Sequence, residues 1–283
     1  MSRPDTIHLR PTAPLAERVL LPGDPGRALA LAQLLIERPK MFNHHRGLWG
    51  YTGPANADGQ PLTIQSTGMG GPSAAIVLHE LAGLSARRAI RVGTCGALHP
   101  ALALGDLIVA REAIAADGAG AALSRLAPPA EHARRTDAGP LAGSATAPPV
   151  ENLDPPLIAS VHAPMRTRAH AELAARLSAV VAAGERPSHL DATIVSTDLF
   201  YEEADADRGA SWREQGAIAI EMEASALFAV GARAGIEVAC LLAVSDTFDA
   251  HGVRTRIDDH SLLEAAEAMG RAAVAALASP RAG

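Results

Sequence analysis

Short apolar runs alternate with longer segments of helical patterning along most of the chain. The apolar runs predict buried strands, which fall at 19–21, 62–66, 89–92, 106–109, 192–195, 218–220 and 237–245. The longer segments predict helices at 27–35, 73–84, 223–234 and 262–277. Near-continuous apolar strands joined by helices indicate a mostly parallel sheet that is covered by helices on both faces. The pattern is therefore that of an α/β protein.

One segment, residues 118–164, breaks this alternation. It is rich in Ala, Pro and Gly and almost free of β-branched apolar residues. Such a composition buries too little apolar area to offset the entropy lost on ordering, so it predicts a flexible surface insertion. An active-site lid is the alternative interpretation. With this insertion included, residues 1–283 are expected to form a single domain.

Composition and charge exclude several classes of protein. The net charge of −6 argues against a general binder of nucleic acids or membrane surfaces. Asp5, Arg10 and Glu17 fall where a secretory signal peptide needs an apolar stretch, and no apolar run approaches the ~20 residues of a membrane span. Cys95 and Cys240 have no metal-binding spacing and are expected to be buried thiols in a reducing cytosol. We expect a cytoplasmic protein that binds no metal, nucleic acid or membrane.

Four glycine-bearing turns are predicted at the carboxyl ends of strands, where open α/β sheets bind their ligands. They are PGDPGR, STGMGGPS, RVGTCGA and the loop after Val244. A turn followed by a helix N-terminus presents free N–H groups that suit a phosphate, although neither a P-loop nor a dinucleotide fingerprint is present. Arg27 and Arg91 frame the same region, and arginine pairs bidentately with phosphate oxygens. The turns and arginines predict an anion site, with surface ion pairs as the alternative.

Carboxylates follow two of the predicted strands. Glu221 and Glu223 come directly after the apolar run 218–220, and a carboxylate at a strand end can accept hydrogen bonds from the vicinal hydroxyls of a sugar. A glutamate that stabilises the start of the following helix is the alternative. Asp246 follows the most apolar strand, where a partly desolvated carboxyl can act as a general acid. For this residue, a turn-capping role is the alternative.

Eight motifs together resemble a known family. In chain order they are PGDPGRA, HRGLWGYTG, STGMGGPSAAI, RVGTCGAL, GDLIVA, STDLFY, AIEMEASALF and LAVSDT. They resemble the type I nucleoside phosphorylases, and among these the bacterial purine nucleoside phosphorylases, over about residues 7–117 and 190–248. RVGTCGA together with EMEA is highly specific to this superfamily. The resemblance implies a single-domain, three-layer α/β/α fold with a mixed, mostly parallel central sheet.

The resemblance also implies roles for particular residues. Those implied for phosphate binding are Gly23, Arg27, Arg91 and Thr94 of one subunit and Arg46 of its neighbour. Those implied for ribose binding are Met222 and Glu223, with His8 of the neighbour. Those implied for base binding are Cys95, Gly96, Phe200, Glu221 and Ser245. The implied catalytic acid is Asp246, which would protonate N7 of the leaving purine with help from Arg254 or, alternatively, Arg256.

The implied reaction is phosphorolysis. Inorganic phosphate, the co-substrate, attacks C1′ of a purine ribonucleoside or deoxyribonucleoside, and no cofactor is required. A uridine phosphorylase, a methylthioadenosine/adenosylhomocysteine-type nucleosidase and a nucleoside-binding regulatory protein on the same scaffold are the alternatives. The choice between adenosine and inosine or guanosine stays open.

Assembly is likewise implied only by the resemblance. Homodimer units that complete each other's sites, assembled as a homohexamer, are expected, with a dimer as the alternative. The apolar and aromatic residues Phe42, Trp49 and Tyr51 suit either a subunit interface or ordinary core packing.

Overall fold

A computed structural model describes residues 6–126, 165–184, 186–201, 206–249 and 253–278. The strands are β1 Arg18–Leu21, β2 Lys40–Asn43, β3 Gly50–Pro54, β4 Pro61–Gln65, β5 Arg88–Ala97, β6 Leu107–Ala116, β7 Arg166–Arg168, β8 Ser188–Thr197, β9 Ala217–Glu221, β10 Glu237–Phe248 and β11 Arg254–Arg256. The α-helices are α1 Pro25–Leu35, α2 Gly71–Gly83, α3 Gly118–Arg125, α4 Ala171–Ala182, α5 Ala206–Glu214, α6 Ala224–Ala234 and α7 Asp259–Leu277, and a 3₁₀ turn spans His45–Gly47.

All the described strands belong to one sheet, in the order β11-β10-β6-β8-β9-β5-β1-β4-β3-β2, with β7 beside β6. A further pairing joins β5 to β10, so β10, β6, β8, β9 and β5 close into a ring. The pairings β1–β4, β1–β5, β5–β10, β6–β8 and β8–β9 are parallel. The others are antiparallel, partly because strands joined by short connections, such as β2, β3 and β4, can only pair that way. The predicted mixed α/β sheet is confirmed, and antiparallel pairings form a larger share of it than the apolar runs indicated.

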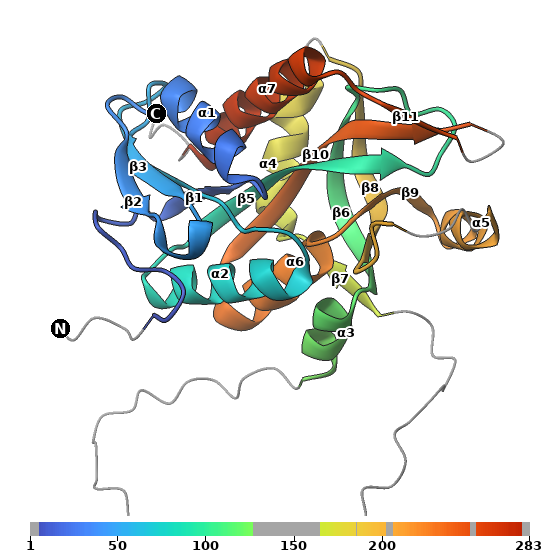
Figure 1. The fold of residues 1–283 in the computed structure, drawn as a ribbon, viewed down its shortest axis with the longest axis horizontal. Coiled ribbons are helices and arrows are strands. Elements are labelled where there is room, and N and C mark those ends of the chain that lie inside the picture. Colours follow the sequence, from blue (N-terminus) through green and yellow to red (C-terminus); the bar gives the residue numbers. More distant parts are fainter. Residues whose placement is uncertain (1–5, 127–164, 185, 202–205, 250–252, 279–283) are drawn as a thin grey trace, which may run out of the picture.

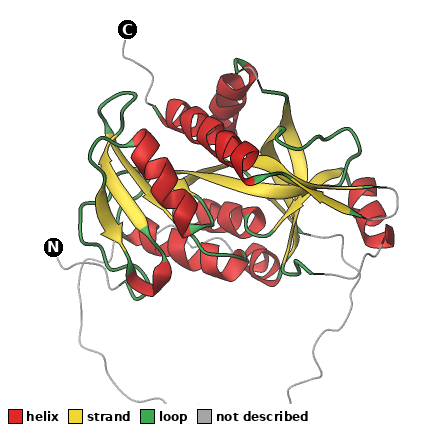
Figure 2. Cartoon of the chain, turned by 45° about the horizontal axis from the view of Figure 1, so that its top comes forward, coloured by secondary structure: helices red, strands yellow, loops and turns green. Residues whose placement is uncertain are grey.

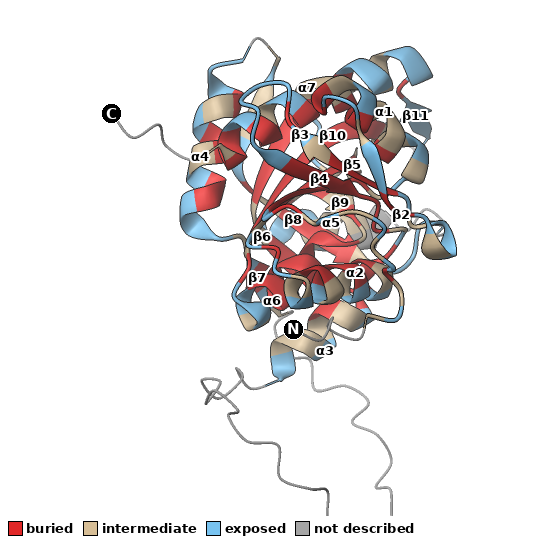
Figure 3. Ribbon diagram, turned by 90° about the vertical axis from the view of Figure 1, so that its left-hand side faces the viewer, coloured by how far each residue is buried: buried red, intermediate tan, exposed pale blue. Residues whose placement is uncertain are grey.

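Helices cover both faces of the sheet (Figures 1 and 2). α1, α4 and α7 pack on one face, and α2, α3 and α6 pack on the other. Alternate residues of β10 supply the two cores: Cys240 and Leu242 join the α2–α6 side, whereas Leu241 and Ala243 join the α1–α7 side. A strand buried on both faces needs apolar residues at every position, which explains its unbroken apolar run. Figure 3 shows the buried strands between the two partly exposed helical layers.

Two predicted turns are instead strands. RVGTCGA does not form a turn, because β5 continues to Ala97 with β10 on one side and β9 on the other. Asp246 does not end its strand either, since β10 runs on to Phe248 and pairs there with β11. The register between β10 and β5 shifts between Val244 and Asp246. Pairing on both sides thus extends each strand past the apolar run that predicted it.

The predicted insertion at 118–164 is wrong at its start, because residues 118–125 form α3. The Asp117 side chain caps this helix by accepting a hydrogen bond from the Gly120 backbone N–H at 2.6 Å. α3 then packs against α6 and α2. Residues 127–164 lie outside the described part of the chain, so neither the flexible insertion nor the lid is tested there. The apolar pattern did not predict α4, α5, β2, β3, β7 or β11.

Several smaller expectations are settled. Gly235 ends α6 in the left-handed conformation, with a φ of 69°, as the predicted end of that helix requires. Phe42 and Tyr51 are buried in the core, whereas Trp49 is 39% exposed. Cys95 and Cys240 are both buried and unbridged. None of the helices in the described ranges has the length and apolar character that crossing a membrane requires.

Candidate active site

Two of the predicted glycine turns lie side by side beyond β1 and β4. The backbone N–H groups of Thr67 and Gly68 donate to the carbonyl oxygens of Pro22 and Gly23 at 2.9 and 3.0 Å. A Cβ at Gly23 would lie 3.3 Å from the Gly68 carbonyl oxygen, so a small residue suits this close approach. In the first turn, the Asp24 side chain caps α1 by accepting from the Arg27 backbone N–H at 2.6 Å. This cap places Arg27 in the first turn of α1, shortly after the residues that contact the second glycine turn.

The Arg91 guanidinium lies between two buried carboxylates. Its Nε donates to Glu221 Oε2 at 3.1 Å and its Nη2 to Glu223 Oε2, and the Arg91 side chain is only 4% exposed. Its Nη1 is also buried but has no hydrogen-bond partner within the described ranges. Burial opposes the charge of Arg91, but Glu223 and Glu221 together hold its pKa above the ordinary value. One buried donor of a charged group therefore remains open for a ligand that accepts hydrogen bonds.

Gly93 provides the space for this guanidinium. A Cβ at Gly93 would lie 2.8 Å from both Cζ and Nη2 of Arg91. Residues two apart on a strand share a face, so the Arg91 side chain folds back over the glycine. Gly93 was predicted only as a turn glycine, whereas the structure makes it part of the Arg91 site.

Glu221 was predicted to contact the base, but its carboxylate is satisfied by its own chain. It accepts hydrogen bonds from the Ser196 hydroxyl and from the backbone N–H groups of Glu223 and Ala224, in addition to Arg91. Its side chain is 1% exposed. The carboxylate thus ties β8, β9, the start of α6 and Arg91 together.

Glu223 links the same cluster to the second glycine turn. Its Oε1 accepts from the Gly70 backbone N–H at 2.6 Å, while its Oε2 accepts from Arg91. Burial raises the pKa of Glu223, against the opposing effect of the Arg91 charge. Met222, between the two glutamates, is half-buried, as is Thr94 on β5. Arg91 and Glu223, which were predicted for phosphate and ribose binding, are therefore in direct contact, and Gly70 links them to the second glycine turn.

A second polar group lies across β5 from Glu221. Gly96 pairs with Asp246 on β10 and with Ile220 on β9, so it lies between the two sets of acidic residues. Asp246 accepts from the Ser245 hydroxyl at 2.6 Å and from Arg254 Nε at 2.7 Å. Ser245 Oγ also lies 3.3 Å from the Cys95 carbonyl oxygen. Arg254, and not Arg256, is therefore the arginine bound to Asp246.

Aromatic side chains border this second group. The Arg254 guanidinium stacks 4.7 Å from the Phe200 ring centroid, and Phe200 as a residue is 51% exposed. A Cβ at Gly96 would lie 3.3 Å from the Phe248 ring. Burial raises the pKa of the Cys95 thiol, which lies 3.6 Å from the Ala243 carbonyl oxygen. An accessible aromatic face and a buried, neutral thiol thus lie near an aspartate held by arginine and serine.

His8 does not join this cluster within one subunit, and the described residues show no contact between Arg46 and the cluster. Glu80 of α2 holds the N-terminal segment: its carboxylate accepts from His8 Nδ1 at 2.8 Å and from the backbone N–H groups of residues 7–9. Gly70, at the Glu223 end of α2, is separated from Glu80 by roughly 14 Å of helix. Desolvation and the positive charges of Arg10 and Arg46 lower the pKa of His45, so these groups lie together in a basic region with His8.

Four residues of the site carried no specific role in the sequence analysis: Gly70, Gly93, Ser196 and Phe248. Three of them stand in motifs that the analysis used, STGMGGPS, RVGTCGA and STDLFY. Ser196 and Gly70 contact residues 25 and 153 positions away, and the role of Gly93 depends on β5 continuing past the predicted strand. Local sequence patterns indicate neither feature. Phe248 carried no signal, because the predicted strand ended before it.

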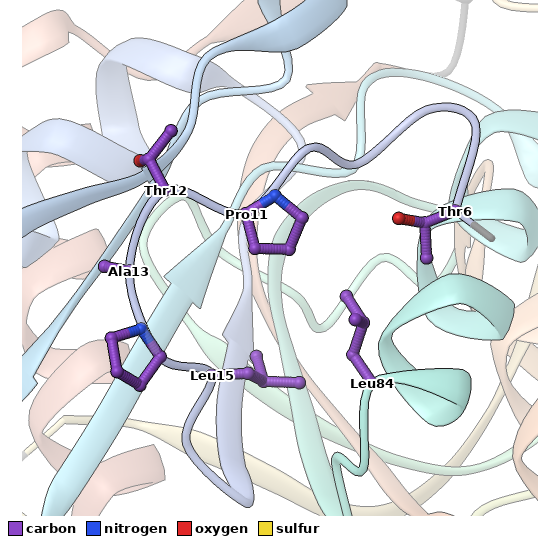
Figure 4. A pocket seen from close by; sticks show the side chains of 7 residues that line it. Thr6, Pro11, Thr12, Ala13, Leu15 and Leu84 are labelled. Carbon is purple, nitrogen blue, oxygen red and sulfur yellow. The ribbon is translucent and has the colours of Figure 1, made fainter. Parts of the chain in front are cut away.

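A pocket of about 340 Å³ opens elsewhere, between the N-terminal segment and the end of α2 (Figure 4). Its lining contains no charged side chain and consists of Thr6, Leu84 and residues 11–15. Leu84 lies at the end of α2 farther from Gly70, so this pocket is separate from the Arg91 cluster. Nor do the described residues contain a group of three His, Cys, Asp or Glu side chains arranged to hold a metal ion.

Known proteins resemble this chain in sequence and in fold. Residues 17–279 match the family model described as the phosphorylase superfamily. Over 234 residues, the chain is 30% identical to the protein named purine nucleoside phosphorylase DeoD-type of Caldanaerobacter subterraneus subsp. tengcongensis, covering 82% of this chain and 84% of that protein. It is 31% identical over 242 residues to the protein of the same name from Alkaliphilus metalliredigens, covering 85% and 87%. The crystal structure of uridine phosphorylase from Vibrio fischeri has a TM-score of 0.66 at 24% identity, over 93% of this chain and 91% of that one.

Proposed function

The chain belongs to the phosphorylase superfamily, and we propose that it is a purine nucleoside phosphorylase, a pentosyltransferase. It cleaves the N-glycosidic bond of purine ribonucleosides or deoxyribonucleosides with inorganic phosphate, which gives the free base and pentose 1-phosphate. The observation that carries this proposal is the buried Arg91–Glu223 pair with an open guanidinium donor, lying across Gly96 from an arginine-bound Asp246. Arg91 suits an anion, Glu223 suits a sugar, and Asp246 suits a leaving base.

Phosphate binds on the Arg91 side of the site. The open Nη1 of Arg91 and the guanidinium of Arg27 donate to its oxygens, and the Thr94 hydroxyl and the Gly23 turn complete the set. Burial lowers the pKa of Arg27, and the Arg91 charge lowers it further, against the effect of Asp24. An anion relieves this crowding of positive charge. Inorganic phosphate is the co-substrate, and the reaction needs no cofactor.

Glu223 holds the ribose. Each carboxylate oxygen has a second lone-pair direction, so Glu223 can accept from the 2′ and 3′ hydroxyls beside its bonds to Gly70 and Arg91. Met222 packs against the sugar. As the C1′–N bond breaks, positive charge develops on the ribose, and the phosphate held beneath it stabilises the transition state. A phosphate oxygen then forms the new bond to C1′.

Asp246 acts on the base. The bond that breaks leaves its electron pair on the purine, and protonation at N7 by Asp246 neutralises the charge that accumulates there. Arg254 and Ser245 then stabilise the carboxylate that remains. Phe200 stacks on the purine, and the edge formed by Cys95 and Gly96 supports it. Glu221 acts on the base only indirectly, by holding Arg91 and the start of α6.

A neighbouring subunit completes the site. His8 is held by Glu80, away from Glu223 of its own chain, and Arg46 lies in the basic region around His45, so both residues suit the ribose and phosphate of another copy. We propose homodimer units that exchange these residues and assemble as a homohexamer in the cytoplasm.

Purines are favoured over uridine by Ser245 and Asp246, because a carboxylic acid can protonate a purine at N7. The two relatives described above are named for purine nucleosides, and they are more similar in sequence than the uridine phosphorylase of known structure. Retention of Arg27, Arg46 and Arg91 favours phosphorolysis over hydrolysis.

The test is base release from adenosine, inosine, guanosine, uridine and methylthioadenosine, each with and without inorganic phosphate. Phosphate-dependent release from purine nucleosides is expected. Equal rates without phosphate would indicate a nucleosidase, and preference for uridine would overturn the purine assignment. Nucleoside binding without any base release would indicate a binding protein.

A further inference from the structure

Asn43 is a fully buried polar residue at the end of β2, and its side chain joins two separate segments of the chain. Its Oδ1 accepts a hydrogen bond from the Arg10 backbone N–H at 2.8 Å. Its Nδ2 donates to the carbonyl oxygens of Leu48 and His45 at 2.5 and 3.4 Å. Moving either segment would leave buried polar atoms without partners, which is costly. The Asn43 amide therefore fixes the N-terminal segment and the turn after β2 relative to each other.

The turn that Asn43 holds carries Arg46 in a strained conformation. Within the 3₁₀ turn His45–Gly47, Arg46 has a φ of 57° and a ψ of 22°, a left-handed conformation that side chains rarely adopt. A second buried amide supports this turn, since Gln65 Nε2 donates to the Leu48 carbonyl oxygen at 2.9 Å. Strain of this kind persists only where the surrounding structure holds it. The two amides supply that support from beneath an exposed turn.

The two segments that Asn43 joins carry the two residues proposed to act in a neighbouring subunit. His8 lies two positions before Arg10, and Glu80 holds it independently. Arg46 is exposed, and no carboxylate in the described ranges pairs with its guanidinium. A cation on a rigid support loses little conformational entropy when it meets an anion. The arrangement thus suits donation of both side chains to another surface.

We propose that Asn43 is a positioning residue for the site of the neighbouring subunit. It sets the separation between the His8 segment and the Arg46 turn, so that one subunit offers its neighbour a ribose ligand and a phosphate ligand as one preformed unit. This inference rests on the proposed function. The Arg46 turn depends on Asn43 more than His8 does, because Glu80 also holds His8. Loss of the Asn43 amide should therefore weaken the use of phosphate before that of the nucleoside.

The test compares Asn43→Ala with Thr52→Val by steady-state kinetics over a grid of phosphate and purine nucleoside concentrations. Because a displacement of roughly 1 Å can cost up to about 100-fold, Asn43→Ala is expected to raise the phosphate KM about fivefold to twentyfold and the nucleoside KM less than about threefold. Thr52→Val is the matched control, since it removes buried hydrogen bonds to Leu62 and Thr63 within the sheet. It should lower Tm and leave both KM values at wild type. A general loss of stability would instead affect both variants alike.

Mixed oligomers show in which subunit Asn43 acts. A refolded mixture of Asn43→Ala and Asp246→Asn chains contains sites in which the intact Asp246 of one chain meets the intact Arg46 turn of the other. These sites should show the phosphate KM of wild type. A phosphate KM that stays raised in demonstrably mixed oligomers would overturn the inference, because Asn43 would then act within its own subunit.

The outcomes also separate this inference from the proposed function. If wild type phosphorolyses purine nucleosides and Asn43→Ala keeps the wild-type phosphate KM, the inference fails alone. If wild type releases no base, the proposed function fails, and the calorimetric Kd of inorganic phosphate decides the inference, with the same rise expected in Asn43→Ala. If wild type binds no phosphate, both fail.

Should Asn43→Ala not fold, Asn43→Asp decides at about pH 8, because an ionised carboxylate keeps the acceptor for the Arg10 N–H and loses the donor to the turn. The phosphate KM should rise in this variant too, and an unchanged value would overturn the inference.

Discussion

Replacement of Gly93 by alanine tests whether the placement of Arg91 governs phosphate use. The added Cβ would lie 2.8 Å from Cζ and from Nη2 of Arg91, so the guanidinium must move by about 0.6 Å to reach an ordinary contact of 3.4 Å. It cannot rotate away freely, since Glu221 and Glu223 hold it and its side chain is 4% exposed. The substitution therefore strains a buried ion pair instead of an exposed side chain.

The expected magnitude has two parts. Overpacking of this kind destabilises a protein by about 1–3 kcal/mol, which lowers Tm by roughly 2–6 °C in a chain of this size. Displacement of a positioning group by a large fraction of 1 Å costs roughly 10- to 100-fold in rate. Because Arg91 is assigned to phosphate, the loss should fall mainly on kcat/KM for phosphate.

Gly96→Ala is the matched comparison on the same strand. Its Cβ would lie 3.2 Å from Ile220 and 3.3 Å from Phe248, near the base side of the site and away from Arg91. The nucleoside KM should rise in this variant and the phosphate KM should stay near wild type. Initial rates over a grid of phosphate and inosine concentrations, with Tm from calorimetry, separate the two. Identical kinetic defects in both variants, or an unchanged phosphate KM in Gly93→Ala, would refute the assignment of Arg91.

Asp246→Asn should sharply reduce turnover of adenosine and inosine, because an amide cannot supply the N7 proton; unchanged kcat/KM on every purine nucleoside would contradict that role. Glu80→Gln should release the N-terminal segment, detected as faster limited proteolysis before residue 10, and cut activity through His8. Burial opposes the Glu80 charge, but the hydrogen bonds from residues 7–9 hold its pKa below the ordinary value, so this anchor is present above the unfolded pKa and is lost as pH falls through the folded one. Wild-type proteolysis that does not rise with acidity would argue against the anchor. Refolding a mixture of inactive Arg46→Ala and Asp246→Asn chains should restore up to about a quarter of the activity, since mixed dimers contain one intact site; no recovery from demonstrably mixed dimers would place Arg46 in its own subunit's site.

The sequence predicted correctly the strands and helices whose burial is uniform along their length. β10 is buried on both faces, so its unbroken apolar run shows it clearly, whereas β11 carries Arg254 and Arg256 and has no apolar pattern at all. The predicted start of the insertion failed for a different reason. α3 consists largely of Gly, Ala and Ser, and its stability depends on the Asp117 cap and on packing against α6, neither of which local composition reveals.

The candidate site likewise contains features that the sequence predicted and contacts that only the fold creates. Glu221 and Glu223 are adjacent in an identifiable motif, but sequence alone assigned the first of them to the base. In the structure, the Glu221 carboxylate accepts hydrogen bonds from Ser196, 25 positions earlier in the chain, and from the backbone at the start of α6. These contacts exist only because the strands close into a ring. Likewise, Arg254 and Arg256 were equivalent candidates. The register of β11 sets Arg256 opposite Asp246, yet it is the Nε of Arg254 that reaches the Asp246 carboxylate.

The charge arrangement around Arg91 explains why this site needs several arginines. Glu221 and Glu223 are both within hydrogen-bond reach of Arg91, so two carboxylates oppose the single charge of the buried guanidinium. Arg91 therefore contributes a directed donor to an anion but little net attraction, since the field of its own partners cancels its charge beyond a few ångströms. The attraction has to come from a cation that is less fully compensated, and Arg27, whose pKa only the Asp24 charge raises, meets that requirement in the same subunit. In this arrangement, Arg91 sets the orientation of the bound phosphate, and the more exposed arginines set its affinity. The affinity is therefore sensitive to ionic strength, whereas the orientation is not.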